Sequence, residues 1–194
     1  YWQLRCEDQL ARQVEMRLTE SLAHYEVIGD DRVIEPWINL SWHVELGDYG
    51  VTVKQERGED LRGGHTGFRW EPPLKDLAQD FEMLRPRRFR VDRERTLADK
   101  AELEKILDGV LPVRLRGRYW WTMGLTQTAI YLIGLEELMV YMYDEPEWLH
   151  RLMAFLRDGT LDLITFLENA GLYSLNNEGD YIGSGGFGWT TQLP

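Results

Sequence analysis

Apolar residues recur at helical spacing near the beginning of the chain and again toward its end. Residues 6–26 carry apolar side chains at steps of three and four, which predicts an amphipathic helix. Residues 144–171 carry a longer stripe, in which Pro146 suits the first turn and Gly171 suits the end. The same reasoning predicts further helices over 74–84, 92–107, 125–133 and 135–143, the second of them capped by Asp92.

β-Branched and aromatic residues mark short strands between these helices. Strands are predicted over 32–38, 110–116 and 173–176. Glycines interrupt the pattern between residues 46 and 70, which favours a hairpin-like excursion or a long loop. The glycine-rich segment 183–188 is predicted to be a flexible loop over the mouth of a site.

The order strand, helices, strand, long helix, strand is typical of a parallel α/β protein, because parallel strands need helical crossovers. A closed eight-stranded barrel takes about 250 residues, and only three or four barrel strands are found here. We therefore expect a partial TIM-type (β/α) barrel with parallel strands and long helical crossovers. It would form one domain, with a leading helix over 1–31 and the first barrel units over 32–194.

Open sheet edges pair readily with other strands, so a partial barrel is expected to associate with another copy or with the remainder of a longer chain. The sequence looks cut from such a chain. A net charge of −11 argues against a nucleic-acid partner, because phosphate binding needs a basic surface. The single cysteine fits a reducing, cytoplasmic compartment, and the longest apolar run is too short to cross a membrane.

Polar and aromatic residues gather just after each predicted strand. Side chains there converge on a common mouth in parallel α/β folds, so we expect the tips near residues 37, 117 and 177 to share one cavity. The candidates after the three strands are Glu35, Trp37, Asn39, Trp42 and His43; Arg116, Arg118, Tyr119, Trp120 and Trp121; and Asn176, Asn177, Glu178, Asp180 and Tyr181.

Three of these residues are candidates for catalysis. Arg116 is suited to holding a substrate carboxylate, although a rim arginine paired to Glu35 or Glu178 fits as well. Glu178 could act as a general acid or base once partly buried, or simply form a salt bridge. His43 is the best imidazole candidate among four histidines, with a structural role as the alternative.

The remaining candidates would bind substrate. Trp120 and Trp121 could form flat apolar walls for a conjugated ligand, although aromatic pairs are more often core. The other predicted substrate-binding residues are Glu35, Trp37, Asn176, Asn177 and Tyr181. No metal ligand is predicted within this chain.

Residues 144–171 also carry a resemblance. The run DEPEWLHRLM from Asp144, followed by a long helix ending in Ala170-Gly171, resembles a helix of the uroporphyrinogen decarboxylase superfamily. Asn176-Asn177-Glu178-Gly179 looks like the polar strand tip that follows that helix, where decarboxylases carry an aspartate and then Trp-Gly-Gly. The Arg-Gln-Ala-Gly-Arg segment with which decarboxylases bind substrate carboxylates does not occur in this sequence.

Both departures favour the divergent, cobalamin-dependent methyltransferase-like branch of the superfamily. The resemblance implies an enzyme domain acting on a small-molecule substrate, with methyl transfer favoured over decarboxylation. It also implies zinc, with ligands outside this chain, and a corrinoid protein as partner. Two alternatives stay open, authentic decarboxylation in porphyrin biosynthesis and a non-catalytic domain that binds a ligand or a corrinoid.

Overall fold

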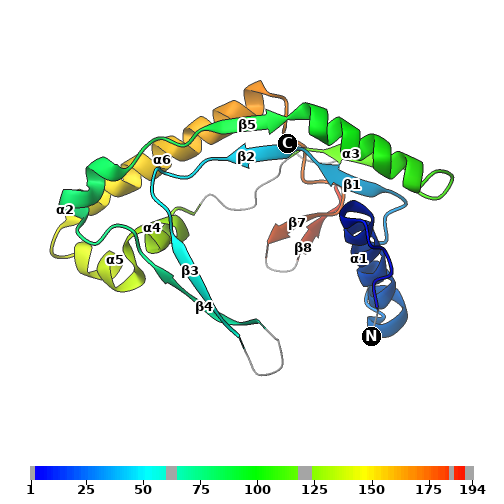
Figure 1. Ribbon diagram of the computed structural model, residues 1–194, viewed down its shortest axis with the longest axis horizontal. Coiled ribbons are helices and arrows are strands. Elements are labelled where there is room, and N and C mark those ends of the chain that lie inside the picture. The colour runs from blue at the N-terminus through cyan, green and yellow to red at the C-terminus, as the bar shows by residue number, and fades with distance from the viewer. Residues whose placement is uncertain (1–2, 60–64, 118–123, 184–185, 191–194) are drawn as a thin grey trace. The chain divides into compact units, whose positions relative to one another are not determined.

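The computed structural model describes residues 3–59, 65–117, 124–183 and 186–190 (Figure 1). They fall into two compact units, each assembled from segments that are distant in the sequence. The first unit draws on residues 1–44, 91–121 and 168–194, and the second on residues 45–90 and 122–167. Helices and strands mix in the chain, which confirms the α/β character predicted from the sequence.

The first unit is built around one parallel strand pair. Its elements are the helix α1 (Gln9–Ala23), which continues into the π-helical turn η1 (His24–Ile28), the strand β1 (Ile38–Ser41), the helix α3 (Arg93–Ile106), and the strands β6 (Val113–Arg116), β7 (Asp180–Gly183) and β8 (Gly186–Gly188). β1 and β6 run parallel, with Ile38 opposite Val113 and Ser41 opposite Arg116. β7 and β8 form an antiparallel hairpin.

Alternation along the parallel pair separates its apolar face from its polar face. Successive side chains of a strand point to opposite sides, so Ile38 and Val113 share one face, and Asn39 and Arg114 share the other. The apolar face packs against α1 and α3 in a small core formed by Val14, Ile38, Leu103, Leu107 and Val113. The polar side chains of the pair therefore lie on the face away from this core.

The second unit has a larger apolar core. It contains the β3–β4 hairpin (Lys54–Glu59 and His65–Glu71), the short helical pieces α2 (Leu77–Asp80) and η2 (Phe81–Met83), the helices α4 (Thr126–Ile133) and α5 (Leu135–Tyr141), and most of α6 (Pro146–Asn169). Leu77, Leu152 and Leu156 are fully buried in its core. The strands β2 (His43–Leu46) and β5 (Phe89–Asp92), which link the two units along the chain, pair with each other.

Most predicted helices are present. α1, α3, α4, α5 and α6 lie within or close to their predicted ranges, and the Asp92 side chain caps α3 by accepting from the backbone N–H of Arg95 at 2.9 Å. The helix predicted over 74–84 is reduced to the short pieces α2 and η2. The hairpin expected between residues 46 and 70 is confirmed by β3 and β4.

The predicted strands need correction. The strand expected over 32–38 instead begins at Ile38, whose N–H donates to the carbonyl of Pro112 at 2.9 Å. Pro36 has no N–H to contribute to such a ladder. The strand expected over 173–176 is only a bridge at Tyr173, and the loop expected over 183–188 belongs to the β7–β8 hairpin.

The described strands pair only two by two. A closed barrel is therefore not formed by the described residues, and the partial barrel stays a prediction, as does the single-domain organisation. In the same part of the chain, none of the helices combines the length and apolar character required to cross a membrane.

Candidate functional site

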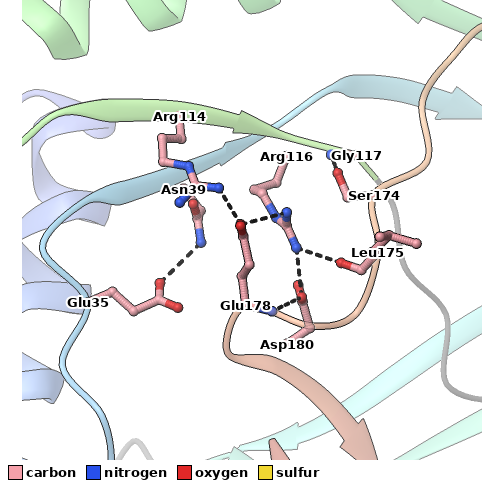
Figure 2. A network of polar contacts seen from close by, with 9 residues as sticks. All are labelled: Glu35, Asn39, Arg114, Arg116, Gly117, Ser174, Leu175, Glu178 and Asp180. Carbon is pink, nitrogen blue, oxygen red and sulfur yellow. Dashed lines mark hydrogen bonds and ion pairs between the residues drawn. The ribbon is translucent and has the colours of Figure 1, made fainter. Parts of the chain in front are cut away.

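The polar face of the parallel pair meets the segment that precedes β7 (Figure 2). Arg114 and Arg116 alternate along β6 and project from its polar face, and Glu178 and Asp180 lie opposite them. Asn39 and Glu35 come from β1 and the chain just before it. Three segments that are far apart in the sequence thus bring five ionisable side chains together, as expected for the tips near residues 37, 117 and 177.

Arg116 is the most buried of the four ion-paired side chains in this group. Its Nη1 donates to Glu178 Oε2 at 3.0 Å, and its Nη2 donates to Asp180 Oδ2 and to the Leu175 carbonyl, both at 2.7 Å. The Arg116 side chain is 13% exposed. Hydrogen bonds between ionised groups are stronger than neutral ones, so these contacts hold the guanidinium in one orientation.

Glu178 joins the two arginines. Besides Arg116 it accepts a hydrogen bond from Nη2 of Arg114, and its own backbone N–H donates to Asp180 Oδ2 at 3.3 Å. The guanidinium carbon of Arg114 lies 4.3 Å from the centre of the Trp37 ring, in cation–π geometry. Arg114 therefore contacts both the Trp37 ring and Glu178.

Two glycines allow the backbone segments to approach each other. A Cβ at Gly117 would lie 2.7 Å from the backbone nitrogen of Ser174, and the Gly117 N–H donates to Ser174 Oγ at 2.7 Å. Gly179 has φ +81°, and its N–H donates to the Gly188 carbonyl at 2.8 Å. Glycine adopts such a positive φ without steric cost, so the turn can present Glu178 and Asp180 on either side of Gly179.

Glu35 occupies a different environment from Glu178. Desolvation is the largest effect on it and raises the pKa of this carboxyl, and the nearby Asp180 carboxylate raises it further. Trp37, Arg114 and Arg116 act in the opposite direction without cancelling the rise in pKa. Asn39 Nδ2 donates to Glu35 Oε2 at 3.3 Å, while Oε1 is buried without an aligned partner.

Four buried polar atoms of this cluster have no aligned hydrogen-bond partner. They are Glu35 Oε1, Trp37 Nε1, Asn39 Oδ1 and Arg116 Nε. The indole N–H of Trp37 lies near enough to Glu35 to oppose the rise in its pKa, but it does not meet hydrogen-bond geometry. Buried polar groups are usually satisfied, so a group of unsatisfied donors and acceptors is a feature of sites that bind a ligand or water.

The structure does not bring His43 into this cluster. Its Nε2 lies 2.6 Å from Asp99 Oδ2, and its backbone N–H donates to Thr96 Oγ1 at 3.0 Å. Both partners belong to α3, which packs on the opposite, apolar face of the strand pair. These contacts correspond to the structural alternative for His43.

The structure brings some of the other predicted residues into the cluster and leaves others outside it. Glu35, Trp37, Arg116 and Glu178 meet in the cluster. Asn176 and Asn177 are half-buried in the turn before Glu178, but the described hydrogen bonds of the cluster come from Glu178 and Asp180. The remaining predictions concern Tyr181, which packs edge to face on Phe187 in the hairpin, and Trp120 and Trp121, which lie outside the described residues.

The sequence pattern predicts no role for Arg114, and it marks Asp180 and Asn39 as candidates without assigning a role to either. Strand alternation could have identified Arg114, because it lies two residues before Arg116 and must share its face. Asp180 follows Glu178 at the same spacing of two. Both arginines therefore face acidic partners from one turn.

The described residues contain no group of three His, Cys, Asp or Glu side chains that could hold a metal ion. Partial desolvation and then the Glu15 carboxylate raise the pKa of the Cys6 thiol, which disfavours the thiolate that zinc requires. The cluster carboxylates Glu178 and Asp180 face arginines instead. Within the described ranges, the residues do not fit a zinc site.

Comparison of the chain with protein-family models, with curated proteins and with solved structures yields no match. The class that the described residues define is a mixed α/β protein with a charged cluster on the polar face of a parallel strand pair.

Proposed function

We propose that this chain is the N-terminal part of a uroporphyrinogen decarboxylase-like (β/α) barrel enzyme, and that its activity is methyl transfer rather than decarboxylation. The substrate is a small molecule bound at the polar face of β1 and β6. The proposal rests on the resemblance of residues 144–179 to that superfamily and on the position of the cluster. In parallel α/β folds, ligands bind at the carboxyl ends of strands, where Arg116 and Glu178 meet.

The observation that favours methyl transfer is the internal neutralisation of Arg116. A decarboxylase acting on a polycarboxylate needs arginines that are open to substrate carboxylates. Here Glu178, Asp180 and the Leu175 carbonyl already occupy both terminal nitrogens of Arg116. A substrate carboxylate would have to displace them, and leaving Glu178 or Asp180 without a cation would carry a desolvation cost.

Authentic decarboxylation remains the second candidate, because Arg114 is only partly buried, with 34% of its side chain exposed. A ligand-binding or corrinoid-binding domain without catalysis is the third, supported by the unsatisfied polar atoms around Trp37 and Asn39. In the favoured reading the corrinoid is carried by a partner protein. Because the residues that the structure describes do not fit zinc, no step through a metal is assigned to them.

Activity of the intact protein that contains this sequence tests the proposal. Demethylation of methylcobalamin in the presence of a thiol, followed by absorbance, reports methyl transfer, and chromatography of porphyrins reports decarboxylation of uroporphyrinogen. The proposal expects activity in the first assay. Porphyrin products with no demethylation would support the decarboxylase instead, and inactivity in both would favour the binding domain.

Substitutions link the activity to the cluster. We expect Arg116→Ala and Glu178→Gln each to lower turnover at least about tenfold, since each breaks a charge-assisted contact in the site. Arg157→Ala is the matched control, because Arg157 is exposed and pairs with its neighbour Asp158. Normal turnover in both cluster variants would remove these residues from the site.

A further inference from the structure

The cluster contains one more carboxyl group than it has arginines. Arg114 and Arg116 carry two positive charges, and they pair with the carboxylates of Glu178 and Asp180. Glu35 is the third carboxyl and forms no ion pair among the described contacts. An ionised Glu35 would add an uncompensated negative charge next to Asp180.

Glu35 is also poorly solvated on one side. Its Oε1 is buried, and Gly179 lies against it, since a Cβ added at Gly179 would collide with Oε1. Oε2 accepts only the 3.3 Å hydrogen bond from Asn39. Removing a carboxylate from water without a paired cation is unfavourable, and such a group takes up a proton instead.

From this geometry we infer that Glu35 is held as a neutral carboxylic acid, and that it recognises the ligand of the cluster by donating an O–H hydrogen bond to a ligand oxygen or nitrogen. Glu178 is then a positioning residue, whose carboxylate orients Arg114 and Arg116. This inference rests on the proposed function for the presence of a ligand, and it names the ligand chemistry: a group that accepts a hydrogen bond.

The groups that face Glu35 agree with this assignment. Desolvation and Asp180 raise its pKa, whereas Trp37, Arg114 and Arg116 lower it less. Glu178 differs from Glu35 in its contacts, because it accepts hydrogen bonds from both Arg114 and Arg116 and so has paired cations.

Infrared difference spectroscopy of the intact protein tests the protonation state directly. At about pH 6 an ordinary glutamate, with a pKa of about 4.3, is ionised. We expect a carboxylic-acid carbonyl band at that pH which disappears in Glu35→Gln and persists in Glu178→Gln. Absence of the band in the unsubstituted protein, or its survival in Glu35→Gln, would overturn the inference.

Kinetics in the methylcobalamin assay test the hydrogen bond. Glu35→Gln keeps an N–H donor and is expected to stay within about threefold of the original KM, whereas Glu35→Ala should raise KM about tenfold through loss of one hydrogen bond. Equal KM for the alanine variant and the original protein would overturn the donor role. Inactivity of the original protein would count against the proposed function, while the infrared band would still decide whether Glu35 is neutral.

Discussion

The two units of the chain bury different kinds of side chain. The second unit packs aliphatic and aromatic side chains such as Leu77, Leu152 and Leu156 into a continuous apolar core. The first unit has a small apolar core on one face of β1 and β6 and a charged cluster on the other. Of the buried side-chain polar atoms without partners among the described residues, four belong to the first unit and one, Arg87 Nε, to the second.

This difference indicates how stability and function are divided. Apolar burial stabilises in proportion to the area removed from water, so the second unit gains stability from its core without needing polar networks. In the first unit, one face of the strand pair carries arginines and carboxylates at positions where hydrophobic residues could have packed. Natural proteins accept such departures mainly at functional sites.

The largest expected effect comes from the core of the second unit. Leu152 lies on α6 and is 0% exposed, so Leu152→Ala should lower the free energy of unfolding by about 2–5 kcal/mol through lost contacts and a cavity. Leu161→Ala on the same helix is the control, because Leu161 is 54% exposed. Urea unfolding followed by circular dichroism measures both. Equal effects would show that the core does not provide the stability assigned to it.

A buried hydroxyl of the first unit should have a smaller effect than Leu152. Thr96 is 0% exposed, accepts from the His43 N–H at 3.0 Å and donates to the Asp92 carbonyl at 2.6 Å. Thr96→Val leaves the His43 N–H without that acceptor, which should cost about 1–3 kcal/mol in the same unfolding experiment. Thr96→Ser keeps the hydroxyl and is expected to cost less. A valine variant as stable as the serine variant would contradict the role given to this hydrogen bond.

Alanine substitutions at two glycines distinguish the cost of steric contact from the cost of backbone strain. Gly179 and Gly171 both have positive φ, +81° and +63°, but an added Cβ at Gly171 meets nothing within 4 Å. Gly171→Ala should therefore cost about 1 kcal/mol from strain alone. Gly179→Ala should cost about 1–3 kcal/mol more by overpacking against Glu35 and Trp189. Equal losses would mean that the turn does not lie against Glu35 as described.

Much of the helical structure could be predicted from the sequence because it depends on local pattern. The stripe of α6, the Gly134 break between α4 and α5, and the Asp92 cap are each encoded within a few residues. The strands were less predictable. β5 at Phe89–Asp92 lies in an arginine-rich stretch, and its pairing with β2 depends on residues far away in the sequence.

The meeting of Arg116 and Glu178 could be predicted from the sequence, but the other contacts of the cluster could not. The rule that polar residues after parallel strands converge identified Arg116 and Glu178, which do meet. Two features of the cluster depend on long-range geometry. Arg114 reaches Glu178 across 64 positions, and Gly179, which lies against Glu35 Oε1, is far from Glu35 in the sequence.

The division of roles between Glu35 and Glu178 leads to opposite effects on stability. A carboxyl whose pKa is raised by folding contributes stability that is fully present below its unfolded pKa and is lost as the pH rises through the folded pKa. Glu35→Gln removes this loss, so its stability relative to the original protein should improve as the pH rises. Glu178→Gln removes a carboxylate from two arginines and should destabilise at neutral pH.

The most direct test is the free energy of unfolding of the original protein, Glu35→Gln and Glu178→Gln, measured by urea unfolding at a series of pH values from acid to mildly alkaline. We expect the stability of Glu35→Gln relative to the original protein to rise with pH, and Glu178→Gln to be less stable than both at neutral pH. A Glu35→Gln variant that instead falls behind as the pH rises would contradict the assignment of Glu35 as the neutral carboxyl of the cluster.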